Sequence, residues 1–171
     1  MDLKAVNKND LGAMIAGVVA LFFSFFSYYA RASVKGFGSA GTSAWDSYAT
    51  LGMLLILVAL AAAAVFAFAG QVLPAGVPWR LIAAGVAGLG TLLLILRAFT
   101  YSDGGAGFSG VDVSVGPGWS AYLLFISTIA MTVFLVLGGL GAGQKFSDFQ
   151  NLGNKGGPST PPPPPPAPPT A

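Results

Sequence analysis

The sequence contains no cysteine, no histidine and no glutamate, and only 8% of its 171 residues are charged. Without cysteine there can be no disulfide and no thiolate metal site. Without histidine there can be no histidine-ligated haem and no serine–histidine–aspartate triad. The net charge of +2 comes from scattered basic residues, which argues against a nucleic-acid partner. The composition therefore predicts a non-enzymatic protein with no cofactor or metal site.

The charged surface that a water-soluble fold needs is also missing, because an ordinary soluble domain has about 25% charged residues. Instead, 54% of the chain is hydrophobic, and residues 11–29 are nineteen consecutive residues without a charge. A helix of that length rises ~28 Å, close to the ~30 Å hydrocarbon core of a bilayer. The predicted spans are residues 11–29, 49–70, 81–98 and 119–140.

These spans predict an all-α integral membrane four-helix bundle over residues 11–143, with lipid as its main partner. Residues 1–10 form a polar lead, and residues 144–171 form a juxtamembrane segment followed by a disordered Pro-rich tail. A cleaved signal peptide fits less well, because the first apolar stretch is longer than such a segment and ends in bulky aromatic residues.

Small side chains recur along one face of the first span at spacings of four and three, and a similar pair occurs in the third. In lipid, small residues let helix backbones approach closely. The predicted helix-packing residues are Ala13, Gly17, Ala20, Ser24, Ser27, Ala84 and Gly88. We expect this packing to involve the chain's own helices, other membrane proteins or a second copy.

Two longer Gly-rich loops, residues 30–48 and 99–118, are expected on the outer side. Residues 36–41 match G-x-G-x-x-G, but they lack the strand and helix that a dinucleotide site requires, so the match is attributed to chance. Val111, Val113 and Val115 alternate with polar residues, a pattern typical of a short strand.

The loops and the adjoining helix end also hold the candidate outer polar cluster, which comprises Asp46, Arg97, Asp103 and Asp112. Arg97 lies near the end of the third span. Its charge could simply extend to the membrane surface, or it could pair with Asp46 or Asp103.

Basic residues predict the orientation, since Lys and Arg are enriched on the cytoplasmic side. The side with both termini and the 71–80 turn carries Lys4, Lys8, Arg80, Lys145 and Lys155. The other side carries Arg31, Lys35 and at most Arg97. Both termini are therefore expected in the cytoplasm of a multi-pass plasma-membrane protein.

The tail contains an uninterrupted proline run, which favours polyproline II and excludes helix and sheet. The candidate partner-docking residues are Pro161, Pro162, Pro163, Pro164, Pro165 and Pro166. The run is either a spacer or a docking segment for a polyproline-binding cytoplasmic protein.

Aromatic residues cluster at the ends of the predicted spans and in the turn between the second and third. FFSFFSYY ends the first span, AWDSY precedes the second, VLPAGVPW forms the turn, LRAFT ends the third and GPGWSAYL opens the fourth. Over about residues 9–143 the chain resembles a group of small four-span membrane proteins of actinobacteria. The resemblance implies the four-helix architecture and a Pro- or Gly-rich cytoplasmic tail. It implies no activity, so no functional residue is carried over.

The favoured function is a non-catalytic accessory or scaffold component of a membrane or cell-envelope assembly. The alternative is a small transporter or channel subunit, which the lack of a charged residue in the middle of any span disfavours. Such a pore would be lined by Ser24, Ser27, Ser127, Thr128 and Thr132. An enzyme acting on the envelope through the loop aspartates is disfavoured by their sparse distribution.

Overall fold

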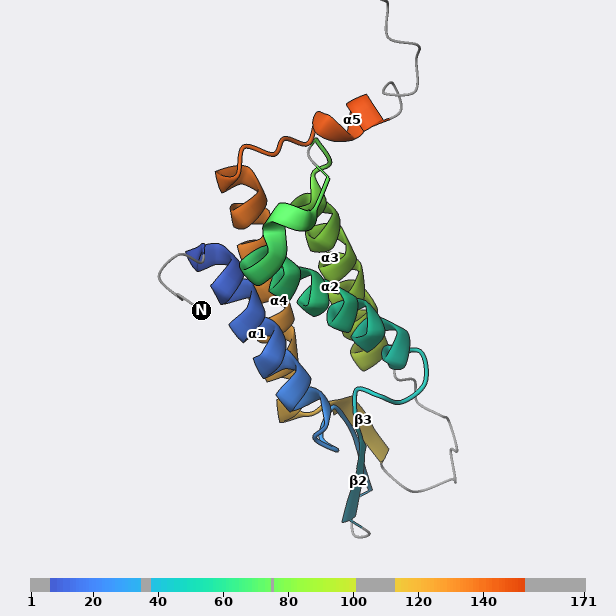
Figure 1. Cartoon of the computed structure of the whole chain (residues 1–171). Coiled ribbons are helices and arrows are strands. Elements are labelled where there is room, and N and C mark those ends of the chain that lie inside the picture. Colours follow the sequence, from blue (N-terminus) through green and yellow to red (C-terminus); the bar gives the residue numbers. More distant parts are fainter. Residues whose placement is uncertain (1–6, 35–37, 75, 101–112, 153–171) are drawn as a thin grey trace, which may run out of the picture.

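The computed structural model describes residues 7–34, 38–74, 76–100 and 113–152. It shows a helical bundle with a small sheet at one end (Figure 1). In chain order the elements are α1 (Lys8–Ser24), β1 (Ala30–Val34), β2 (Gly38–Thr42), α2 (Ala49–Ala69), η2 (Gly70–Val72), α3 (Trp79–Phe99), β3 (Val113–Pro117), α4 (Trp119–Gly141) and α5 (Asp148–Leu152).

Three of these helices, α2, α3 and α4, are long and apolar enough to cross a membrane. They contain 21, 21 and 23 residues, and their limits agree with the predicted second, third and fourth spans within two residues. The chain is therefore a multi-pass membrane protein. The first helix, α1, is shorter at 17 residues and includes two charged residues in its first turn, Lys8 and Asp10.

The prediction that the first helix extends to residue 29 is wrong, because α1 ends at Ser24. The chain beyond it turns and enters β1, whose backbone pairs with strands on both sides. The Tyr29 amide already donates to the Thr42 carbonyl at 2.9 Å, and the Ala44 amide donates to the Ser24 carbonyl at 3.2 Å. Tertiary strand pairing thus overrides an apolar aromatic stretch that could have remained helical.

The predicted all-α fold is confirmed only in part, because the structure is mostly helical but also contains a small sheet. The strands form an antiparallel sheet in the order β2-β1-β3, with Ala30 opposite both Thr42 and Pro117. The hairpin β1–β2 lies within the stretch expected as a loop. The strand expected around Val113 and Val115 is confirmed as β3, whereas Val111 lies outside the described residues.

Small residues allow the helices to pack closely. Buried alanines occur on all four long helices, and the backbones of α2 and α3 approach each other closely at two glycines. A Cβ added at Gly52 would lie 3.0 Å from the Gly90 carbonyl oxygen, and one added at Gly90 would lie 2.9 Å from that of Gly52. In lipid, such close contacts replace the hydrophobic drive that holds soluble helices together.

Candidate functional site

A buried ion pair joins the first turns of α1 and α3. Arg80 Nε donates to Asp10 Oδ1 at 3.0 Å, and Nη2 donates to Oδ2 at 2.6 Å. The Asp10 side chain is 1% exposed and that of Arg80 is 20% exposed. This two-point geometry is the strong form of an arginine–carboxylate contact.

Neighbouring helices complete the surroundings of this pair. The Arg80 guanidinium lies 5.4 Å from the centre of the Phe66 ring of α2, within the range of a cation–π interaction. Gly138 of α4 leaves space beside it, since a Cβ there would lie 3.1 Å from Asp10 Oδ1. All four long helices therefore meet at this ion pair.

This pair was not among the predicted contacts, because Asp10 falls in the polar lead and Arg80 in the 71–80 turn. The available signal was that both residues were assigned to the same side of the membrane. A separation of 70 residues leaves no periodic pattern that would join them.

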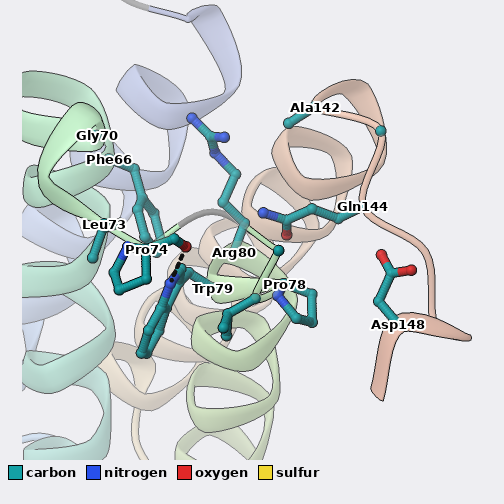
Figure 2. Close-up of a pocket in the computed structure, with 13 residues that line it drawn as sticks. Phe66, Gly70, Leu73, Pro74, Pro78, Trp79, Arg80, Ala142, Gln144 and Asp148 are labelled. Carbon is teal, nitrogen blue, oxygen red and sulfur yellow. Dashed lines mark hydrogen bonds between the residues drawn. The ribbon is translucent and has the colours of Figure 1, made fainter. Parts of the chain in front are cut away.

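A cavity of about 550 Å³ adjoins Arg80 at this end of the bundle (Figure 2). Its walls come from the end of α2, the α2–α3 turn, the start of α3 and the segment joining α4 to α5. The lining residues used below are Leu73, Pro74, Pro78, Trp79, Gln144 and Asp148.

Two hydrogen bonds hold these walls. Trp79 Nε1 donates to the Pro74 carbonyl at 3.3 Å, and the Leu81 amide donates to Gln144 Oε1 at 3.4 Å. The second bond connects α3 to the segment after α4, whose direction changes at Gly143 with a φ of 77°. Glycine adopts this left-handed conformation without steric cost.

The opposite end of the bundle is fixed by aromatic residues. The Tyr29 hydroxyl donates to the Leu94 carbonyl of α3. Burial raises the pKa of Tyr29 above its usual range, while the nearby charge of Arg97 lowers it to a smaller extent. The hydroxyl therefore stays protonated and able to donate. Trp45 Nε1 donates to Ser24 Oγ at 2.9 Å, which ties the turn before α2 to the end of α1.

Two glycines lie directly against the backbone of the turn after α1. A Cβ at Gly41 would collide with the Ser27 carbonyl oxygen, and a Cβ at Gly118 would collide with that of Tyr28. Only glycine fits at these positions without movement of the backbone.

The predicted outer polar cluster is described only in part. The Arg97 guanidinium lies 5.2 Å from the centre of the Tyr48 ring, and Asp46 is exposed in the turn before α2. Asp103 and Asp112 lie outside the described residues, as do the prolines at 161–166.

The predicted packing face occupies the interior side of α1 over most of its length. Ala13, Gly17, Ala20 and Ser24 are buried, whereas Ser27 lies beyond the helix and is exposed. In α3, Ala84 is buried. Gly88 is half-buried, and a Cβ there would be in ordinary contact with the Thr132 methyl group.

No protein-family model matches the chain, and neither the curated proteins nor the solved structures contain a significant match. Within the described residues, no group of three or more potential side-chain ligands is placed to hold a metal ion.

Proposed function

We propose that this chain is a non-catalytic membrane protein with four spans, in which α1 supplies the fourth crossing. It would act as an accessory or scaffold component of a membrane or cell-envelope assembly. The outward face of α1 supports the crossing, since Ile15, Val18 and Phe22 are 56%, 55% and 60% exposed. Large apolar side chains also point outward from α2, α3 and α4. Many exposed apolar side chains of this kind suit contact with lipid and would make a soluble protein aggregate.

The observation that supports the scaffold function is that, among the described residues, the buried polar side chains are hydrogen-bonded within the bundle, with Ser120 Oγ as the exception. Asp10 and Arg80 neutralise each other. Hydroxyl groups of the helices bond to their own backbone, as in Thr91 to the Ala87 carbonyl at 2.8 Å and Ser127 to the Leu123 carbonyl at 2.7 Å. Polar side chains that already bond within the bundle support an architectural role, because catalytic side chains must be free to exchange protons or bind substrate.

The distribution of basic residues supports cytoplasmic termini. Lys8, Arg80 and Lys145 belong to the end of the bundle with the α2–α3 turn and α5, whereas Arg31 and Arg97 belong to the end with the sheet (Figure 1). With the first end in the cytoplasm, the Pro-rich tail would meet a polyproline-binding cytoplasmic protein. The bundle would meet other membrane proteins or a second copy through its lipid-facing surface.

Affinity purification from native membranes tests this function. We expect the full chain to retain a cytoplasmic partner that is lost when residues 157–171 are deleted. A matched control replaces the prolines at 161–166 with alternating Gly and Ser, which keeps the tail length but removes polyproline II structure. If the same partners co-purify with all three proteins, the docking role of the tail is wrong.

A transporter or channel subunit is a second candidate because of the buried ion pair. Charged residues within membrane helices often mark ion or proton pathways, and Arg80 of this pair also lines the cavity. Flux measured in liposomes containing only this protein distinguishes the two functions. A carrier would show flux that Asp10→Asn reduces, whereas the scaffold proposal expects no flux from either protein.

A further inference from the structure

The cavity beside Arg80 lies next to the point where the chain leaves the bundle. Asp148, the first residue of α5, is part of its lining, and α5 ends four residues later at Leu152 (Figure 2). The described chain therefore ends about one helical turn beyond the cavity lining. A volume of about 550 Å³ is within the usual range for a site that binds a small ligand or a short peptide segment.

The apolar part of the lining matches proline. Leu73, Pro74, Pro78 and Trp79 come from the α2–α3 turn and the first residue of α3. Polyproline II segments bind grooves lined by aromatic residues, against which their rings pack. Such segments are already extended, so they lose little conformational entropy when they bind.

The polar part of the lining supplies hydrogen-bond donors, which a proline run requires. Proline has a backbone carbonyl but no N–H, so a proline run can only accept hydrogen bonds from its surroundings. The Gln144 side chain accepts the Leu81 amide through Oε1, and its NH₂ group remains available to donate. Trp79 Nε1 has a long bond of 3.3 Å to the Pro74 carbonyl, which a better acceptor could replace.

We propose that this cavity binds the chain's own proline run, residues 161–166, so that the tail exchanges between the bundle and a cytoplasmic partner. The inference rests on the proposed docking function of the tail. It adds an internal competitor for the same segment, and partner binding must then displace the tail from the cavity.

The connecting chain is long enough for this contact. Eight residues, 153–160, separate Leu152 from the first proline of the run, so that Leu152 and Pro161 can lie at most about 32 Å apart when this segment is fully extended. A linker of this length gives an effective concentration on the order of 1 mM. A cavity that bound the free segment with a Kd of about 1 mM would therefore hold the attached tail about half of the time.

Fluorescence quenching in the full chain tests the proposal. Because the chain has no cysteine, Ser159→Cys provides one attachment site for a nitroxide quencher. In detergent micelles, the emission of Trp79 is obtained by subtracting the emission of the equally labelled Trp79→Phe variant from that of the labelled chain. We expect the quencher to remove about half of this emission, in line with the docked fraction.

Two matched variants separate docking from random approach. Replacing residues 161–166 with alternating Gly and Ser keeps the tail length, and Gln144→Ala removes a donor from the cavity while the tail is unchanged. We expect quenching to fall at least twofold in both variants, and free peptide 157–171 to relieve it in the original chain. Equal quenching with the Gly-Ser tail, or no quenching of Trp79 at all, overturns the proposal. Because no partner is present, failure here leaves the co-purification test of the scaffold function independent.

Discussion

The ion pair between Asp10 and Arg80 gives the most specific stability prediction. Asp10→Asn keeps the size of the side chain but removes its charge, so that Arg80 retains a positive charge without its counter-ion. Breaking a fully buried ion pair on one side costs about 3–5 kcal/mol. Arg80 is 20% exposed and can recover some hydration, so we expect a loss of about 2–3 kcal/mol in the free energy of unfolding.

The assay is unfolding of the purified protein by SDS in mixed micelles, followed by circular dichroism. A double-mutant cycle adds Arg80→Gln and the combined variant. We expect the combined variant to lose at least 1 kcal/mol less than the sum of the single losses, because the second change removes the stranded charge. Asp46→Asn, at an exposed aspartate, is the matched control and should stay within about 0.5 kcal/mol of the original protein. If Asp10→Asn unfolds like Asp46→Asn, the pair does not hold the helices together.

Three further predictions use the same assay. Gly118→Ala should cost about 1–3 kcal/mol, because its Cβ would collide with a backbone carbonyl of the turn after α1. Gly116→Ala should cost much less, because a Cβ at Gly116 would face open space. Equal losses of stability in the two variants would show that Gly118 does not lie tightly against the turn. Gly52→Ala should destabilise through the close contact of α2 with α3, whereas Gly85→Ala should be neutral or stabilising by up to about 1 kcal/mol. A larger loss of stability in Gly85→Ala than in Gly52→Ala would contradict the close packing of α2 against α3. Tyr29→Phe should cost about 0.5–1.5 kcal/mol through loss of its bond to α3, and an unchanged stability would mean that this bond contributes nothing.

Local patterns in the sequence predicted the helices that cross the membrane. An apolar stretch of about twenty residues has few alternatives in a chain with so little charge. Consequently α2, α3 and α4 lie where hydropathy places them. The spacing of Ala13, Gly17 and Ala20 also indicated the side of α1 that is buried.

Contacts between distant residues could not be predicted in this way. Residues 25–29 continue the uncharged stretch of the helix before them, and α1 ends there because β1 is paired on both sides by strands from elsewhere in the chain. Asp10 and Arg80 each looked like an ordinary interfacial charge until the fold brought them together. The cavity is likewise formed by segments whose proximity depends on the packing of α2, α3 and α4.

The number of membrane crossings tests the central claim most directly, because α1 is the helix whose crossing is proposed. Single cysteines at Ala5, Ser39 and Ser159 can be probed in intact cells with a membrane-impermeant maleimide, since the chain has no other cysteine. With four crossings and cytoplasmic termini, Ser39→Cys is labelled in intact cells, while Ala5→Cys and Ser159→Cys react only after lysis. Labelling of Ala5→Cys and Ser159→Cys on opposite sides of the membrane would show an odd number of crossings and contradict the account.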